Sequence, residues 1–351
     1  SGTTSSVALN STVPGSTFTW TAAQQSGASI TGFSDCNTAC GTTIAQTLTN
    51  TTNNASGVVR YTVIPTAPNG CVGSSFTVDV TVNPKPSGSA SNQTICSGFT
   101  TSVTLSSTVP SSTFTWTAAQ LSGSTITGFS NCAAACGTSI AQTLTNTSNA
   151  TPGVVRYTVT PISPSNCPGN TFTVDITVNP KPLGSASPET ICSGATTSVA
   201  LSSTVAGTTY TWTAAQQSGA TITGFSNCGT ACGTTIAQTL TNSTNNTVGV
   251  VRYTVTPTSP DGCVGNTFTV DVTVDPKPLG SASAQSICSG NSTSVTLNST
   301  IGGTAFTWTA AQQSGATITG FSNCNAGCGG TISQVLTNTT NTTAGVVRYT
   351  V

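Results

Sequence analysis

Hydrophobic and polar residues alternate with a period of two along most of the 351-residue chain. Phe18 and Trp20 alternate with threonines, and Val59, Tyr61 and Val63 alternate with residues that suit an outer face. Such alternation turns one face of a strand toward a core and the other toward solvent. The strands predicted in the first part of the chain are 7–9, 17–21, 29–33, 43–50, 59–63 and 76–82. The pattern therefore predicts an all-β fold.

The same pattern returns every 96 residues. The tryptophans mark this period most clearly, at Trp20, Trp116, Trp212 and Trp308. A fixed period indicates an array of similar units, and an all-β unit of about this length fits one immunoglobulin-like sandwich. We therefore predict a tandem array of antiparallel β-sandwich domains, with one tryptophan at the centre of each core.

Proline-rich segments divide the repeats. Asn83–Pro86 recurs as Asn179–Pro182 and as Asp275–Pro278. Two prolines so close together fix φ and favour a stiff, extended connector. The predicted domains are 1–84, which lacks its first strand, 85–180, 181–276, and 277–351, which lacks its last strand. Because both outer copies are incomplete, we expect the chain to be a window from a longer array.

Composition argues against most kinds of chemistry. Charged residues make up 4% of the chain, with seven cationic and seven anionic side chains and no histidine. Nucleic acids and anionic membranes require clustered cations, and histidine is the commonest general base and metal ligand. No apolar run reaches the roughly 20 residues of a membrane-spanning helix. We therefore expect no enzyme activity, no catalytic residue, no cofactor, no metal site, no nucleic-acid partner and no membrane insertion.

Several short motifs resemble a known family. They are Thr94-Ile95-Cys96-Ser97-Gly98, Phe114-Thr115-Trp116, Val155–Val159, Asn166-Cys167 and Val174–Pro180. They look like the PKD-like or Ig-like repeats of Bacteroidota surface proteins, including gliding-motility adhesins of the SprB type and other type IX secretion cargo. The resemblance implies a non-catalytic part of an extracellular fibre or adhesin stalk at the cell surface. Such modules also serve as carbohydrate-binding or spacer modules in large secreted polysaccharide-degrading enzymes, which is the alternative function.

Fourteen cysteines at fixed repeat positions indicate an oxidising, extracellular compartment. Each repeat carries two cysteines separated by three residues. A zinc site would need four ligands within reach, which this spacing does not provide. We predict four local disulfides, namely Cys36–Cys40, Cys132–Cys136, Cys228–Cys232 and Cys324–Cys328.

The remaining six cysteines leave three pairings open. The favoured pairing joins cysteines on either side of each proline-rich junction, Cys71–Cys96, Cys167–Cys192 and Cys263–Cys288. A rival joins Cys96 to Cys167 inside one sandwich, although the end of the first strand and the turn between the last two lie at opposite poles of an Ig-like fold. The third pairing bridges neighbouring domains.

Two further features concern partners. A carbohydrate-binding platform would need exposed aromatic side chains, whereas Phe18, Trp20, Tyr61 and Phe76 are all predicted to face inward. The expected partners are neighbouring copies of the same repeat, in the same chain or in filament protomers, with surface glycans as a further candidate. Glycosylation sequons are abundant, for example at Asn50, Asn54, Asn146, Asn149, Asn242, Asn245, Asn338 and Asn341, and the Asn/Ser/Thr-rich composition also explains their abundance.

Charge placement yields one more prediction. Arg60 and Asp79 lie at equal distances from the centre of the turn between two predicted strands. An antiparallel hairpin would place them opposite each other as an exposed cross-strand ion pair.

Overall fold

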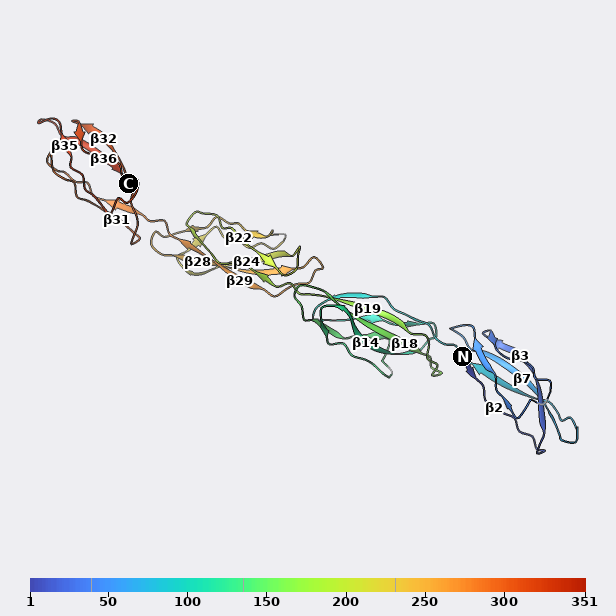
Figure 1. Ribbon diagram of the computed structural model, residues 1–351. Helices are drawn as coiled ribbons and strands as arrows, with labels where there is room; N and C mark the ends of the chain where they lie inside the picture. Colours follow the sequence, from blue (N-terminus) through green and yellow to red (C-terminus); the bar gives the residue numbers. More distant parts are fainter. Residues whose placement is uncertain (39, 135, 231) are drawn as a thin grey trace. The chain divides into compact units, whose positions relative to one another are not determined.

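The computed structural model describes residues 1–38, 40–134, 136–230 and 232–351, and in these residues the regular secondary structure consists of β-strands (Figure 1). The all-β prediction is confirmed. Two compact units are present, Ser1–Pro182 with Asp261–Cys263, and Leu183–Pro260 with Val264–Val351.

The second repeat contains a complete sandwich. Its larger sheet has the order β10 (Gln93–Cys96), β19 (Phe172–Asn179), β18 (Gly153–Ile162), β14 (Thr113–Gly123). β18 runs antiparallel to both neighbours, whereas β10 runs parallel to β19. The shorter strands are β11 (Phe99–Thr100), β17 (Thr143–Asn146) and β15 (Ile126–Thr127) in one sheet, with the pairs β12 (Val103–Thr104)–β16 (Ser139–Ile140) and β9 (Gly88–Ser89)–β13 (Ser106–Ser107).

The third repeat has the same arrangement. Its larger sheet has the order β21 (Glu189–Cys192), β29 (Phe268–Asp275), β28 (Gly249–Thr258), β24 (Thr209–Gly219), again with one parallel pair, β21–β29. The shorter pairs are β20 (Gly184–Ser185)–β23 (Ser202–Ser203), β22 (Val199–Ala200)–β26 (Thr235–Ile236) and β25 (Ile222–Thr223)–β27 (Thr241–Asn242).

The first repeat has a three-stranded version of the larger sheet. Its order is β3 (Thr17–Gly27), β7 (Gly57–Thr66), β8 (Phe76–Val82). The smaller strands are β1 (Thr3–Thr4), β6 (Thr47–Asn50) and β4 (Ile30–Thr31), with β2 (Val7–Ala8) paired to β5 (Thr43–Ile44). Within the described ranges, no strand equivalent to β10 pairs with β8.

The fourth repeat has a two-stranded version. β32 (Thr309–Gly315) pairs with β36 (Gly345–Thr350), and no described strand takes the place that β29 has beside β28. The smaller strands are β30 (Gly280–Ala282), β31 (Val295–Ser299) and β34 (Thr331–Ile332), with β33 (Ile318–Thr319) paired to β35 (Thr337–Asn338).

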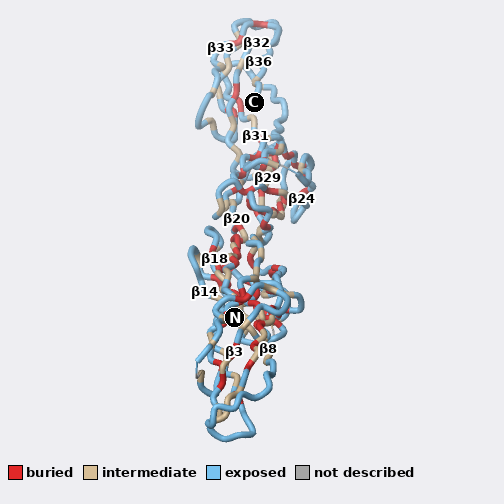
Figure 2. The backbone as a smooth tube through the Cα atoms, turned by 90° about the vertical axis from the view of Figure 1, so that its right-hand side faces the viewer, coloured by how far each residue is buried: buried red, intermediate tan, exposed pale blue. Residues whose placement is uncertain are grey.

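Each repeat buries its own hydrophobic core. Figure 2 marks the buried residues in red along the backbone. All four tryptophans are buried, with 6–7% of their surface exposed. Tyr61, Tyr157 and Tyr253 are buried completely. The fourth core is the smallest, with Leu297, Trp308 and Ile332 as its buried members.

Phe76 lies on the inner face as predicted, opposite the buried Val63, but it is only partly covered there. Its exposed fraction is 36%. In the second repeat, Gly88 lies directly against the ring of the equivalent Phe172, and a Cβ at that glycine would be 2.3 Å from the ring. The segment around Gly88, which follows the proline-rich junction, thus covers Phe172 in the second repeat. No described segment covers Phe76 in the same way.

The cross-strand ion pair is confirmed. Arg60 lies opposite Asp79 in the β7–β8 register, and its guanidinium donates two hydrogen bonds of 2.7 Å to the carboxylate. Arg156–Asp175 and Arg252–Asp271 repeat this arrangement. The guanidinium lowers the pKa of Asp79, chiefly through these hydrogen bonds. The side chains of these pairs are 24–43% exposed, and screening by solvent limits their contribution to stability.

Candidate functional site: braced loops and junction cysteines

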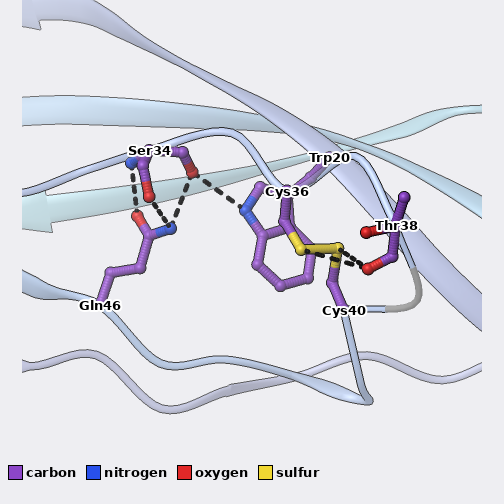
Figure 3. The surroundings of a disulfide bond; sticks show 6 residues. All are labelled: Trp20, Ser34, Cys36, Thr38, Cys40 and Gln46. Atoms are coloured by element: carbon purple, nitrogen blue, oxygen red, sulfur yellow. Dashed lines mark hydrogen bonds between the residues drawn. A yellow bond between two sulfur atoms is a disulfide. The ribbon is translucent and has the colours of Figure 1, made fainter.

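A disulfide braces the loop that follows the tryptophan strand in each repeat. Cys36 and Cys40 are bonded, with their Cα atoms 5.9 Å apart, and their side chains pack against the core beside Trp20 (Figure 3). The structure has the same bond at Cys132–Cys136, Cys228–Cys232 and Cys324–Cys328. These are the four local pairs expected from the spacing.

The braced loop covers the free edge of β3. The backbone of Trp20 donates to the carbonyl of Cys36 at 2.9 Å and accepts from its amide at 2.8 Å, and Cys40 donates to the carbonyl of Phe18 at 3.0 Å. An uncovered edge strand presents unpaired backbone groups that other chains can bind. The disulfide thus holds a segment that closes this edge of the sheet.

Gln46 connects the braced loop to the core, and the sequence analysis missed it. Its amide nitrogen donates to the carbonyl of Ser34 at 2.7 Å, while its oxygen accepts from the amide of Ser34 at 3.0 Å and from the hydroxyl of Tyr61 at 2.8 Å. The indole of Trp20 donates to the same Ser34 carbonyl at 3.3 Å (Figure 3). Recurrence as Gln142, Gln238 and Gln334 is the signal that could have identified it.

Burial changes the acidity of the tyrosines in this network. Desolvation raises the pKa of Tyr157 and of Tyr253 to about 12. Each hydroxyl donates to a glutamine oxygen, at 2.7 Å to Gln142 and 2.8 Å to Gln238. The neutral phenol is therefore the form that the folded repeat holds.

Three of the candidate sequons are structural. Asn50, Asn146 and Asn242 are 6–7% exposed. The amide nitrogen of Asn50 donates to the carbonyls of Ala55 and Val82, at 2.8 and 3.0 Å, and so ties the two sheets together. The equivalent nitrogens of Asn146 and Asn242 make the same kind of contacts. A glycan on these nitrogens would break both bonds, so these three sequons are unavailable in the folded chain.

The favoured pairing of the remaining cysteines is wrong. Cys96 is bonded to Cys263, with Cα atoms 5.5 Å apart and 167 residues between them in sequence. Cys71, Cys167, Cys192 and Cys288 are free. The bond joins a strand-end cysteine of the second repeat to a turn cysteine of the third, which corresponds to the third pairing considered, between neighbouring domains.

Strand direction explains why the other pairings fail. Cys96 ends β10 and is level with Asn179 at the end of β19, whereas Cys167 precedes the start of β19. The two cysteines of one repeat therefore lie at opposite ends of the same sheet. Likewise Cys71 precedes β8, so the seven residues of that strand separate it from the junction that follows. A disulfide needs Cα atoms within about 7 Å.

Side-chain and backbone hydrogen bonds link the junctions to neighbouring loops. In the first unit, the hydroxyl of Thr108 donates to the carbonyl of Asn53 and accepts from the amide of Ser87. In the second unit, Thr300 donates to the carbonyl of Asn245 at 2.6 Å, and the amide of Asn245 donates to the carbonyl of Lys277 at 3.1 Å. These bonds tie the linker to the repeats on either side of it.

Among the described residues, no group of three or more His, Cys, Asp or Glu side chains could hold a metal ion. No helix in the described part of the chain is long and apolar enough to cross a membrane.

Comparison with known proteins gives one family. The model of a family described as "PKD-like domain" matches residues 1–86, 93–182, 189–278 and 285–351. No curated protein matches the chain. Similar solved structures include Drosophila N-cadherin EC1-4, at 12% identity over 99% of this chain and 95% of that one with a TM-score of 0.26. The I9–I11 tandem of titin is 11% identical over 79% of this chain and 94% of that one, with a TM-score of 0.26.

Proposed function

Since the chain belongs to the PKD-like domain family, we propose that it is the repeat region of an extracellular fibre or adhesin stalk. Tandem PKD-like and Ig-like repeats are typical of extracellular structural or adhesion modules. The observation that carries the proposal is the recurrence, in all four repeats, of a separate core with its own braced loop. Repeating similar modules in series lengthens a chain without adding a catalytic or binding site.

The proposed modules are 1–84, 85–180, 181–276 and 277–351, with each boundary in a Pro-Lys-Pro segment. Their role is mechanical, to carry a binding or anchoring segment away from a surface. Five disulfides in the chain support an oxidising exterior as its location. A surface poor in charge and rich in threonine and serine stays hydrated without depending on ionic strength. The finer proposal is a surface adhesin of the Bacteroidota gliding type, exported by the type IX route.

The location can be tested on intact cells. Antibodies against the chain, applied to unpermeabilised cells of the source organism, should label thin structures outside the cell envelope in immunogold micrographs. A strain lacking the gene provides the control for labelling. Labelling that appears only after permeabilisation would overturn the proposal.

The alternative function is a carbohydrate-binding or spacer module of a secreted polysaccharide-degrading enzyme. One observation favours it, because Phe99 is 59% exposed. Its equivalents in the other repeats are Thr3, Ala195 and Asn291, so the described repeats do not form a row of aromatic platforms. Affinity electrophoresis in gels containing soluble polysaccharides should therefore show no retardation. Retardation that Phe99→Ala abolishes would favour the alternative.

A further inference from the structure

The six junction cysteines fall into two classes that recur at fixed positions. Strand-end cysteines follow a Thr-Ile or Ser-Ile pair, and they are Cys96, Cys192 and Cys288. Turn cysteines lie in or next to the turn that precedes the last strand of the larger sheet, and they are Cys71, Cys167 and Cys263. The single bond among these six joins one member of each class.

The same sequence offset explains which cysteines are free. Cys96 and Cys263 are 167 residues apart and bonded. A cysteine 167 residues after Cys192 or Cys288 would fall past residue 351, and one 167 residues before Cys167 would fall just ahead of Ser1. Hence the only pair of positions at this offset that the sequence contains is the bonded pair.

Local structure presents a strand-end cysteine in the same way whether it is bonded, as Cys96 is, or free, as Cys192 is. β10 and β21 both run parallel to the last strand of their sheets, so Cys96 and Cys192 end level with Asn179 and Asp275. The turn is alike in the two free turn cysteines, since the amide of Ala67 donates to the carbonyl of Cys71 as that of Ser163 does to Cys167. Bonding changes mainly exposure, because Cys263 is fully buried whereas Cys71 is exposed.

We propose that every free junction cysteine is one half of such a bond. Each turn cysteine takes the strand-end cysteine of the preceding copy of the repeat, and each strand-end cysteine takes the turn cysteine of the following copy. The disulfide partner of each free cysteine is therefore a cysteine of the opposite class on another copy of this repeat. The free cysteines are Cys71, Cys167, Cys192 and Cys288.

The bond forms by thiol–disulfide exchange. One cysteine thiolate attacks an oxidised disulfide, of an oxidoreductase in the cell or of glutathione in vitro, and forms a mixed disulfide while one thiol leaves. The second cysteine thiolate then displaces the other thiol and completes the cystine. Two protein thiols lose two electrons and two protons, and the oxidant becomes two thiols.

The test adds the missing partner to the intact chain. The four residues Gln-Thr-Ile-Cys, copied from Gln93–Cys96, are placed ahead of Ser1, and the protein is refolded in a glutathione redox buffer. Free thiols are then alkylated and the disulfides mapped in non-reducing digests. We expect the added cysteine to bond to Cys167, which changes from fully alkylated to almost unalkylated. The Cys96–Cys263 bond serves as the internal positive control, and the same extension ending in serine should leave Cys167 alkylated.

Mixing isotopically light and heavy copies identifies the source of the partner. Light–light and heavy–heavy pairs alone mean a bond within one chain, whereas mixed pairs mean a bond between chains, and either supports the proposal. Cystines that join two turn cysteines or two strand-end cysteines would contradict it, as would full alkylation of Cys167 in the extended chain.

A second variant tests class specificity in the unextended chain. Cys263→Ser removes the partner of Cys96, and we expect Cys96 then to be alkylated in the monomer rather than bonded to Cys71 or Cys167. Formation of either of those bonds within one chain would overturn the class rule.

Discussion

Gln46 is the residue on which the braced loop depends most, since one amide group satisfies the backbone of Ser34 and the hydroxyl of Tyr61. Removing one partner from a buried hydrogen bond leaves the other unsatisfied. The sequence contains this glutamine at the same place in every repeat. Its role was missed because a polar residue in a threonine-rich strand region gives no periodic signal that separates an inward amide from an outward one.

We expect Gln46→Ala to destabilise the first repeat by about 1–3 kcal/mol, the cost of leaving the hydroxyl of the buried Tyr61 without its partner. Urea unfolding followed by tryptophan fluorescence measures the change. Gln25→Ala is the matched control, because Gln25 is an exposed glutamine near the end of β3 in the same repeat, and it should change stability by less than about 0.5 kcal/mol. Equal effects of the two variants would contradict the role assigned to Gln46.

The buried tyrosines predict a loss of stability at alkaline pH. An unfolded tyrosine ionises near its ordinary pKa of about 10, whereas the pKa of Tyr157 and of Tyr253 in the folded chain is about 12. Between these values the unfolded chain releases protons that the folded chain retains, so stability is complete below about pH 10 and falls as pH rises toward 12. Urea midpoints measured across this range should therefore decrease.

Phenylalanine variants test the cause of that decrease. Tyr157→Phe together with Tyr253→Phe should lower stability at neutral pH, because the bonds to Gln142 and Gln238 are lost, but should give a shallower decline above pH 10. A decline as steep as that of the unchanged chain would assign the alkaline effect to other groups.

At the scale of the element, alternation located nearly every long strand. It succeeded at β3, β7 and β8 because each has one face in the core and one in solvent. It placed Phe76 on the correct face but did not predict its 36% exposure, because the cover of this position depends on a segment from outside the strand, as Gly88 shows for Phe172. Alternation describes the two faces of a strand and carries no information about which other segment lies on them.

The sheet of the third repeat predicts which segment pairs with β36. In the third repeat β28 pairs with both β24 and β29, and among the described residues the equivalent β36 pairs with β32. A hollow of about 630 Å³ beside β36 is lined by core residues such as Leu297, Ile332 and Tyr349. A peptide with the sequence of Phe268–Asp275 should add to β36 by backbone pairing and fill the hollow.

Calorimetric titration of the chain with this peptide measures the binding. In the third repeat Asp271 pairs with Arg252, whereas the structure gives the equivalent Arg348 no ion pair among the described residues. The same peptide with Asp271→Lys is therefore the matched control, and we expect it to bind more weakly because two cations would face each other. Equal affinity for both peptides would show that binding does not use the β29 register.

At the scale of the whole molecule, the 96-residue period yielded the number of repeats and the local disulfides but not the bond between Cys96 and Cys263. Alternation and spacing describe one sandwich at a time, and this bond depends on how two repeats meet. The parallel run of β10 beside β19 agrees with the expectation that Cys96 and Cys167 lie at opposite poles of one sandwich. No feature of a single sandwich indicates which cysteine of another repeat Cys96 bonds.

Single-molecule pulling on the two ends of the chain measures how much of the chain the Cys96–Cys263 bond prevents from extending. Under oxidising conditions the 167 residues from Cys96 to Cys263 cannot be extended. Reduction should therefore lengthen the fully unfolded chain by roughly 550–600 Å, at about 3.3–3.6 Å per residue, beyond the small gain from the four local loops. Cys96→Ser should show the longer value without reductant. Equal lengths before and after reduction would exclude the bond in solution.

The bond between Cys96 and Cys263 also determines which part of the backbone bears a pulling force. Suppose that the same bond recurs at every junction of a longer array. A continuous covalent path then runs from a strand-end cysteine through the disulfide to a turn cysteine 167 residues later in sequence. From that turn cysteine it follows the backbone for only 25 residues to the next strand-end cysteine. Each pair of repeats, 192 residues, then offers about 85 Å of extensible backbone. Two such paths, one starting from each of two neighbouring repeats, would run side by side. The covalent bonds would then set the maximum length of the array, because the other 167 residues of each pair of repeats lie inside a closed loop and cannot be extended.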